Sequence, residues 1–378
     1  MKEIARHVVL QFLAALALFG CEKTPAPSSA SPPATPSPAA ATSASPTPLS
    51  GGESTGDTEK SLHVFCWSEY IPQQIVDAFS QESGIKVSVE TYSSNEEMLA
   101  KLFAGGGNYD IIQPSEYVIE GLIKEGRLTP IDHARIPNMK NLAPEFTNMS
   151  FDPGNKYSVP YMAGTVGIVV NTELVEDDIK GYNDVFQEKF AKNIVVLDDA
   201  REIVSWGLET LGIPVNEVSD ENLAKVKPLL EKWLPLVKVF DSDSPKTALL
   251  NGDVALGVVW AGEGAILLNE DQKFKWVVPA EGAHLFVDSL AIPKSAKHAQ
   301  NAELFINYVL RPEVSAKISE AFPYLNPNVA ARELLTPAQR NNPASFPTAD
   351  QLANMQTFKD VGEQATKIDE LVTSLKAQ

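Results

Sequence analysis

The stretch LHVFCWSEYIPQQIVDAFSQESGIKVSVETY, residues 62–92, contains a complete strand–helix–strand unit. Its two ends, LHVFCW and IKVSVETY, are short runs rich in β-branched and aromatic residues, which are typical of strands. The segment between them, residues 72–84, has apolar residues at helical spacing and ends at Gly84, a residue that commonly terminates helices. The order of these elements predicts an α/β fold.

The same alternation continues along the chain. We expect further strands at residues 109–115, 157–171, 193–199, 253–260 and 287–293, and further helices at residues 94–107, 116–126, 223–240 and 302–318. Strands that alternate with helices predict a parallel sheet covered on both faces. Because the roughly 320 residues with this pattern exceed what one hydrophobic core usually holds, we expect two α/β lobes.

The composition is that of a soluble globular protein with an acidic balance. The chain has 378 residues, of which 44% are hydrophobic and 21% are charged, and its formal net charge is -18. An acidic chain is repelled by nucleic acid and by anionic membrane surfaces, so neither is an expected partner. The same balance is compatible with a cationic ligand.

The first 20 residues have the order of a secretory signal peptide. Lys2 and Arg6 precede an apolar run at residues 8–19, which is too short to span a membrane. The sequence LFGC that ends at Cys21 resembles the bacterial lipobox, although Phe19 departs from the small residue usual at that position. We therefore expect lipidation of Cys21 and a membrane-anchored lipoprotein in the periplasm. An ordinary signal peptide cleaved nearby is the alternative.

Residues 21–60 consist mainly of Pro, Ala, Ser and Thr, with almost no large apolar side chain. Such a segment cannot bury enough surface to fold, and its prolines extend it. We expect a disordered tether that holds the folded part up to about 100 Å from the membrane. With Cys21 acylated, Cys66 has no disulfide partner, and we expect it to be a buried small hydrophobe.

The chain lacks the sequence motifs of common enzymes. It contains no G-x-S-x-G elbow, no P-loop and no G-x-G-x-x-G, and its five histidines show no metal-ligand spacing. We therefore expect no catalytic residues, no metal and no cofactor. A pair of carboxylates could still serve glycoside hydrolysis, and only their separation in space would decide that.

The stretch VVLDDAREIVSWGL, residues 195–208, places several carboxylates where a buried strand passes into a helix. Asp199 falls at the N-cap, and Glu202 follows three residues later, which is the spacing of a capping box. Each side chain would then accept a hydrogen bond from a backbone N–H at the helix start. This local prediction requires no ligand.

Nine short segments of the sequence, taken together in their order along the chain, indicate a family more strongly than any one of them alone. They are CWSEYIP from Cys66, TYSSNEEMLAKL from Thr91, YDIIQPSEY from Tyr109, YSVPY from Tyr157, LDDARE from Leu197, LGVVWAGE from Leu256, FVDSLAIP from Phe286, YVLRPEVS from Tyr308 and PYLNPNVAAREL from Pro323. Together they resemble the polyamine-binding proteins of bacterial ABC importers, the spermidine/putrescine receptors. The resemblance extends from about residue 62 almost to the C-terminus.

This resemblance implies a two-lobed periplasmic-binding-protein fold of type II, which closes on its ligand by hinge motion. The chain would cross between the lobes near residues 163–171 and 286–293. Lobe 1 would consist of residues 61–164 and 287–331, and lobe 2 of residues 165–286 and 332–378. An ABC permease complex would recognise the closed form, and we expect the receptor to be a monomer.

A polyamine is an aliphatic chain with ammonium groups, so its site needs spaced carboxylates and apolar or aromatic walls. The resemblance implies thirteen ligand-binding positions: the aromatic residues Trp67, Tyr70, Tyr117, Trp260, Phe286 and Tyr324, the hydroxyl residues Ser68 and Ser115, and the carboxylates Glu69, Asp199, Glu202, Glu263 and Asp288. If Asp199 and Glu202 both cap a helix and bind an amine, we expect Glu202 to be the more committed to the ligand.

Departures from the family pattern leave the choice of polyamine open. Ala163 replaces a Trp and Phe358 replaces a Gln that some spermidine-type members carry. Phe286 and Glu263 are similar to the putrescine-type site, whereas Asp199 with Glu202 is similar to the spermidine-type site. A polyamine sensor that signals through a membrane receptor, and a binding protein for another small cationic solute, are the alternative functions.

Overall fold

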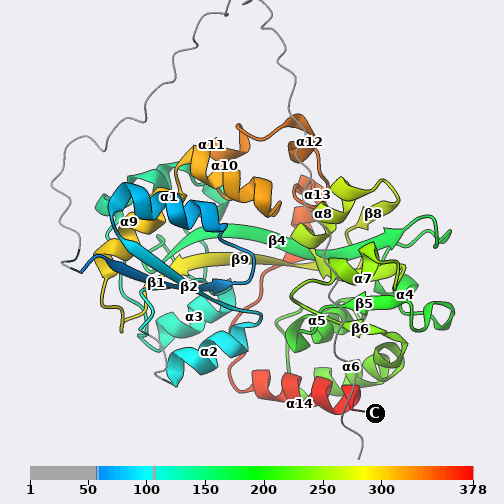
Figure 1. Cartoon of the computed structure of the whole chain (residues 1–378). Coiled ribbons are helices and arrows are strands. Elements are labelled where there is room, and N and C mark those ends of the chain that lie inside the picture. The colour runs from blue at the N-terminus through cyan, green and yellow to red at the C-terminus, as the bar shows by residue number, and fades with distance from the viewer. Residues whose placement is uncertain (1–56, 58, 105–107, 378) are drawn as a thin grey trace, which may run out of the picture. The chain divides into compact units, whose positions relative to one another are not determined.

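In the computed structural model the chain is described at residue 57 and over residues 59–104 and 108–377. The described strands form one ten-stranded sheet with the main order β2-β1-β3-β9-β4-β7-β5-β6 (Figure 1). The strands are β1 Ser61–Trp67, β2 Lys86–Tyr92, β3 Ile111–Ile112, β4 Ser158–Asn171, β5 Ile194–Val196, β6 Val239–Phe240, β7 Leu256–Trp260, β8 Phe274–Val277, β9 Ala283–Ala291 and β10 Met355–Gln356.

The helices lie on both faces of this sheet, and most of the longer ones follow a strand. They are α1 Gln73–Ser83, α2 Asn95–Phe103, α3 Glu116–Lys124, α4 Tyr182–Val185, α5 Ala200–Thr210, α6 Asp220–Trp233, α7 Lys246–Leu250, α8 Ala261–Glu270, α9 Ala299–Val309, α10 Pro312–Ala321, α11 Val329–Arg332, α12 Pro337–Arg340, α13 Ala349–Ala353 and α14 Gln364–Lys376. The expected α/β architecture is therefore present. We call β1–β3 with their helices the first half, and β5–β8 with theirs the second half.

The expectation of a parallel sheet was correct only within each half. β1 pairs in parallel with β2 and β3, and β5 pairs in parallel with β6 and β7. The long strands β4 and β9 run antiparallel to each other and to the neighbouring β7 and β3. The reason is visible in Figure 1: the chain passes from the first half to the second along β4 and returns along β9. The two connecting strands must therefore point in opposite directions.

In the first half, the strand period of two distributes the core between both faces of the sheet. Leu62, Val64 and Cys66 of β1 pack with α1, α9 and α10 on one face. Phe65 points the other way and packs with α2 and α3. This alternation is what a strand buried on both faces requires. Cys66 is 1% exposed, which confirms it as a buried hydrophobe, and burial raises the pKa of its thiol to about 12.

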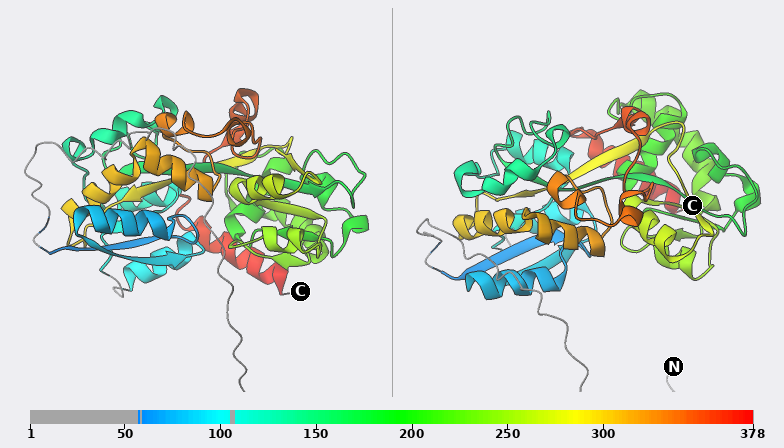
Figure 2. Two further views of the ribbon diagram at one scale, coloured as in Figure 1. Left: turned by 45° about the horizontal axis from the view of Figure 1, so that its top comes forward. Right: turned by 90° about the horizontal axis from the view of Figure 1, so that it is seen from above.

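The second half repeats this arrangement with different helices. Ile194 and Val196 of β5 pack with α5, α6 and α14, whereas Val195 packs with residues of α7 and α8 on the opposite face. The C-terminal helix α14 contributes Ile368 and Val372 to this core and lies against the second half in the left-hand view of Figure 2. The C-terminal helix is therefore part of the hydrophobic core of the second half.

Two expected helices were wrong in extent. Residues 223–240 were expected to form one helix, but α6 ends at Trp233, and Val239 and Phe240 form a strand that pairs with β5. Pro235 has no N–H to continue the helical hydrogen bonds, and the open edge of β5 provides partners for the following residues. Residues 302–318 divide into α9 and α10 at Pro312, which occupies the first turn of α10. The strand expected at residues 109–115 is reduced to β3.

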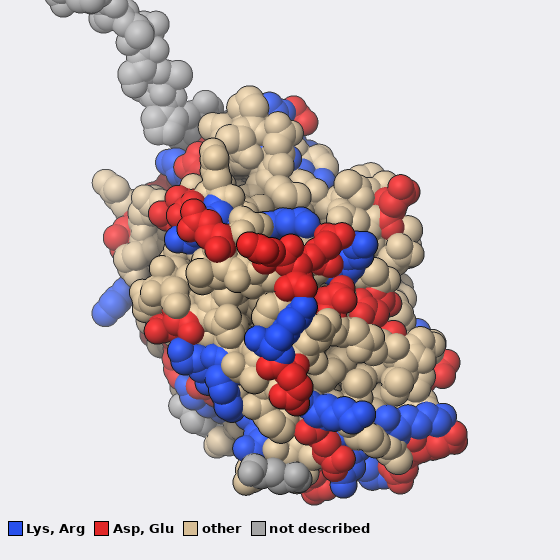
Figure 3. Space-filling model, turned by 90° about the vertical axis from the view of Figure 1, so that its right-hand side faces the viewer, with Lys and Arg blue, Asp and Glu red and all other residues tan. Residues whose placement is uncertain are grey.

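The signal peptide at residues 1–20, Cys21 and nearly all of the tether to residue 60 lie outside the described residues. Among the helices that are described, none has the length and hydrophobicity to cross a bilayer. On the face of the second half seen in Figure 3, acidic and basic side chains are interspersed.

Candidate functional site

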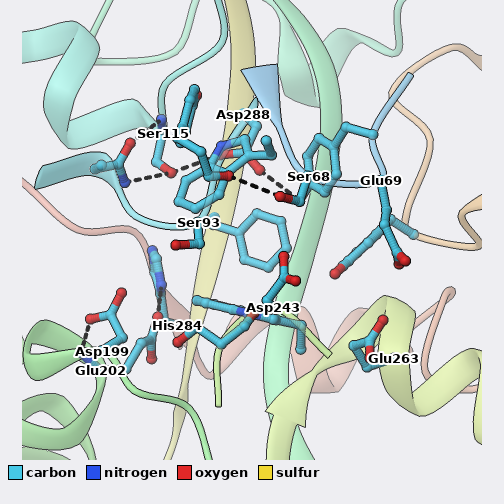
Figure 4. A pocket seen from close by; sticks show the side chains of 18 of the residues that line it. Ser68, Glu69, Ser93, Ser115, Asp199, Glu202, Asp243, Glu263, His284 and Asp288 are labelled. Carbon is cyan, nitrogen blue, oxygen red and sulfur yellow. Dashed lines mark hydrogen bonds and ion pairs between the residues drawn. The ribbon is translucent and has the colours of Figure 1, made fainter. Parts of the chain in front are cut away.

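A cavity of about 770 Å³, counted out to its opening, lies where the two halves face each other (Figure 4). All thirteen residues predicted from the sequence line it. Residues that sequence reasoning did not assign to the site also line it, among them Tyr92, Asn95, Arg201, Asp243, His284 and Phe358. A cavity with aromatic walls and a few polar groups is typical of a small-molecule site.

The first half contributes residues that follow its strands. Trp67 ends β1, and the loop after it carries Ser68, Glu69 and Tyr70. Glu69 has φ 59, a left-handed conformation that turns the chain sharply at the cavity wall. Ser115 lies at the N-cap of α3. These positions at the carboxyl ends of strands are where α/β sheets commonly bind ligands.

Asp288 on β9 is a buried carboxylate held by neutral groups. The Tyr70 hydroxyl donates to its Oδ2 atom at 2.9 Å, and the Ser115 hydroxyl donates to its Oδ1 atom at 2.7 Å. Its exposed fraction is 2%. Burial raises the pKa of Asp288 to about 7, although both hydroxyl hydrogen bonds act in the opposite direction. The site thus contains a costly buried charge for which a cation would be the natural partner.

Asn95, the first residue of α2, positions two of the predicted residues. Its Nδ2 atom donates to Ser115 Oγ at 3.1 Å and to the Tyr117 hydroxyl at 2.8 Å. Asn95 is itself 4% exposed. The amide therefore fixes the serine that donates to Asp288, a role that no sequence motif indicated.

Aromatic rings form the walls of the cavity. The rings of Tyr70 and Tyr324 are 5.5 Å apart, and Trp260 meets Phe286 edge to face at 5.5 Å. The Trp260 indole also donates to the Ser242 carbonyl at 3.1 Å, which fixes the ring. Such faces can contact methylene groups and attract cations.

Two glycines make room for these rings. A Cβ atom at Gly262 would lie 2.3 Å from Tyr324, and one at Gly164 would lie 2.6 Å from Phe286. Both distances are far below van der Waals contact, so any larger residue would displace a ring. The glycine of the WAGE segment thus sets the position of the Tyr324 wall.

Asp199 caps α5 as predicted, but the capping box is only half formed. The Glu202 N–H donates to Asp199 Oδ1 at 2.9 Å. The reciprocal bond expected from the Glu202 side chain is absent, because Glu202 Oε1 instead contacts His284 Nδ1 at 2.5 Å. Burial raises the pKa of Asp199 to about 8, and the negative charges of Glu96 and Glu202 add to the effect.

His284 on β9 connects carboxylates from both halves. Its second ring nitrogen, Nε2, lies 2.9 Å from Oε1 of Glu116 at the start of α3. Burial lowers the pKa of His284, but the charges of Glu202 and Glu116 outweigh it and raise the pKa to about 10. The ring stacks on Phe358, with centroids 3.5 Å apart.

Glu263 on α8 is paired with a lysine that sequence reasoning did not consider. Lys246 Nζ donates to Glu263 Oε1 at 2.9 Å and Oε2 at 3.0 Å, and to Glu69 Oε2 at 3.3 Å. Burial raises the pKa of Glu263, whereas the charge of Lys246 acts to lower it. The three side chains form an ion-pair bridge between the loop after β1 and the second half.

The signals for these missed residues were not local. His284 is separated by 82 residues from Glu202 and by 168 from Glu116, and Lys246 is separated by 177 from Glu69. No motif spacing covers such separations. Within the described residues, no group of three or more His, Cys, Asp or Glu is arranged to hold a metal ion.

Comparison with known proteins agrees with this architecture. Residues 74–348 match the family model described as bacterial extracellular solute-binding protein. The spermidine/putrescine-binding periplasmic protein of Salmonella typhimurium is 36% identical over 318 residues, which cover 84% of this chain and 91% of that protein.

Solved structures give the same result. The spermidine/putrescine ABC transporter substrate-binding protein PotD of Streptococcus pneumoniae is 34% identical, with a TM-score of 0.73 over 84% of this chain and 99% of that chain. The TpPotD lipoprotein of Treponema pallidum is 26% identical, with a TM-score of 0.74 over 84% of this chain and 100% of that chain. The chain therefore has the two-lobed α/β fold of periplasmic binding proteins, and it belongs to the bacterial extracellular solute-binding proteins, in the group of the spermidine/putrescine-binding periplasmic proteins.

Proposed function

We propose that the protein binds a polyamine outside the cytoplasm and delivers it to an ABC importer. The names of the Salmonella and Streptococcus relatives support both the ligand class and the transporter. The observation that carries the proposal is Asp288, a buried carboxylate held by two hydroxyls inside an aromatic-walled cavity. A ligand ammonium would supply a positive charge beside Asp288 and donate a charge-assisted hydrogen bond to it.

The thirteen predicted residues form the proposed binding site. In this proposal the aromatic rings contact the methylene groups, and the carboxylates and hydroxyls contact the ammonium groups. Lobe 1 consists of residues 61–164 and 287–331, and lobe 2 of residues 165–286 and 332–378, with closure about β4 and β9. The position of the cavity between the two halves supports this division.

Binding without catalysis is part of the proposal. The family is one of solute-binding proteins, and the site described above has carboxylates held by hydroxyls and cations. Incubation with a panel of glycosides and with polyamines should give no product by chromatography. Turnover of any of these compounds would contradict a purely binding function.

Membrane attachment through a lipid on Cys21 is a separate part of the proposal. The LFGC segment supports it, as does the relative from Treponema pallidum, which is described as a lipoprotein. Cys21→Ser should move the protein from the membrane fraction to the soluble periplasmic fraction. If the variant remains in the membrane fraction, the thiol is not the site of attachment.

Direct binding measurements test the ligand class. Calorimetry and thermal shift with putrescine, cadaverine, spermidine and spermine should detect at least one ligand with micromolar or tighter affinity, about -8 kcal/mol or better. A neutral sugar and an inorganic anion are the controls. The absence of a response to all four amines would refute the proposed ligand class.

A further inference from the structure

The cavity contains a histidine that is already bound like a ligand ammonium. His284 is 3% exposed, and each of its ring nitrogens faces a carboxylate oxygen, at 2.5 Å on Glu202 and 2.9 Å on Glu116. A neutral imidazole has only one N–H, so one of these contacts would then oppose a nitrogen lone pair to a carboxylate. The imidazolium can donate to both partners, and although burial lowers the pKa of His284, the charges of Glu202 and Glu116 raise that pKa to about 10, which favours the protonated ring at neutral pH.

The surroundings hold this imidazolium in place. Phe358 stacks on the ring at an interplanar angle of 10°. Glu116 also accepts hydrogen bonds from the backbone N–H groups of Val287 and Phe358, so it cannot turn away from the ring. The cation is thus a fixed part of the cavity wall.

The imidazolium changes what Glu202 can offer a ligand. Glu202 is 1% exposed, its Oε1 atom is taken by His284, and its Oε2 atom has no hydrogen-bond partner among the described residues. A ligand N–H could still reach Oε2, but it would share the Glu202 carboxylate with the imidazolium. A second protein cation lies close by, because the Arg201 guanidinium is 4.7 Å from the Phe358 ring. An additional ammonium at this end would meet two positive charges.

At the opposite end of the cavity, lining carboxylates are also paired with a cation of the protein. Glu263 is bound through both oxygens by Lys246, which also bonds to Glu69. Three of the carboxylates that line the cavity, Glu202, Glu263 and Glu69, therefore share two cations of the protein, His284 and Lys246. Lining carboxylates outside these ion pairs are Asp288, Asp199 and the exposed Asp243.

The lining carboxylates outside these ion pairs match a short ligand. Asp288 is buried and Asp199 is partly buried, and Figure 4 shows them on opposite sides of the cavity. A diamine would place one ammonium group beside each of these two carboxylates. The proposal therefore rests on the charges that line the cavity and not on its volume.

We propose that His284 is a specificity-determining residue whose imidazolium takes the place of a third ammonium beside Glu202, so that the site selects a diamine over a triamine. The proposal rests on the polyamine-binding function proposed above and adds the class of polyamine. It reverses the rank expected from the sequence, since Asp199 rather than Glu202 becomes the ligand-committed carboxylate of α5.

Calorimetry of the full-length chain with putrescine and spermidine tests this proposal. Wild-type protein should bind putrescine at least about tenfold more tightly, the discrimination expected for one unmatched charged group. His284→Gln removes the resident cation and leaves Glu202 and Glu116 for a third ammonium. The ratio of the spermidine Kd to the putrescine Kd should therefore fall by about tenfold or more.

The chain offers a matched control. His298 also lies between two carboxylates, Asp110 at 2.9 Å and Glu59 at 3.2 Å, but it does not line the cavity. His298→Gln should leave the ratio of the two Kd values as in wild type, because it removes a similar ion pair elsewhere.

The outcomes separate the two proposals. Folded His284→Gln with the wild-type ratio, or wild-type protein that binds spermidine more tightly than putrescine, would overturn the role of His284 while leaving polyamine binding intact. If His284→Gln does not fold, the ratio of the spermidine Kd to the putrescine Kd of the wild-type protein tests whether the site selects a diamine. Failure of the wild-type protein to bind either amine would instead refute the proposed function, and the specificity proposal with it.

Discussion

Asp288 and Glu263 are buried carboxylates in the same cavity, but their neighbours differ. Asp288 accepts hydrogen bonds from two neutral hydroxyls, whereas Glu263 is bound through both oxygens by Lys246. Their exposed fractions, 2% and 5%, are nearly equal, so burial does not distinguish them. The difference lies in whether the protein supplies its own cation. The number of Asp and Glu residues in such a cavity therefore does not equal the number of ammonium groups it can bind.

Asp288→Asn should have the largest effect. It removes the carboxylate for which a ligand ammonium is the missing partner, and putrescine affinity should fall by about 100-fold, the upper range for one charge-assisted hydrogen bond. Calorimetry gives the affinity, and thermal unfolding of the ligand-free variant checks that the fold is intact. If the variant binds putrescine with an affinity within threefold of wild type, Asp288 is not the partner of a ligand ammonium.

The pH dependence of affinity should identify the same carboxylate. Tyr70, Ser115, Glu116 and His284 surround Asp288, and its pKa is about 7 in the ligand-free protein. A cationic ligand binds the ionised form, so a proton must leave when binding occurs below pH 7. Affinity should rise by about tenfold between pH 6 and pH 8 and then level off.

Calorimetry in two buffers of different ionisation enthalpy should detect the accompanying proton release at pH 6.5. The variant Asp288→Asn should show a weaker pH dependence than wild type. If its pH dependence equals that of wild type, the titrating group lies elsewhere, with Asp199 as the next candidate because its pKa is about 8.

Lys246→Met should act in the opposite direction to Asp288→Asn. It releases Glu263 and Glu69 from their internal cation, so spermidine affinity should rise by about fivefold, or about 1 kcal/mol. The modest size follows from Glu69, whose side chain is 54% exposed and therefore screened by water.

Lys124→Met is the matched control for this change. Lys124 also bridges two carboxylates, Glu120 at 3.2 Å and Asp360 at 3.1 Å, but none of the three lines the cavity. Its removal should leave spermidine affinity as in wild type. Weaker spermidine binding by Lys246→Met would show that the lysine supports the site instead of competing for it.

Asp199→Ser should have the smallest effect on stability and a moderate effect on binding. Serine retains an N-cap for α5, so the free energy of unfolding should change by only a few tenths of a kcal/mol. Putrescine affinity should fall by about threefold, less than for Asp288, because Asp199 with its pKa of about 8 is largely protonated at neutral pH. Thermal unfolding and calorimetry measure the two effects separately. Lower stability with unchanged affinity would make Asp199 a cap only.

Much of the fold and of the site composition could be predicted because the signals are local or contiguous. The alternation within residues 62–92 gave β1, α1 and β2 with ends within two residues of those observed. The order of nine segments gave thirteen residues that the structure brings to one cavity. Errors occurred where distant chain segments decide the outcome, as at Val239 and Phe240, which become a strand only because β5 lies beside them.

The sequence by itself determined the α/β class through hydrophobic periodicity, and its resemblance to a family through contiguous motifs gave the two-lobed fold and thirteen of the residues that line the cavity. Only the tertiary structure decided how those residues are charged. His284 and Lys246 reach carboxylates that are distant in the chain, and Asp288 accepts hydrogen bonds from two hydroxyls. Electrostatic compensation depends on distances between atoms, which no spacing in the sequence specifies.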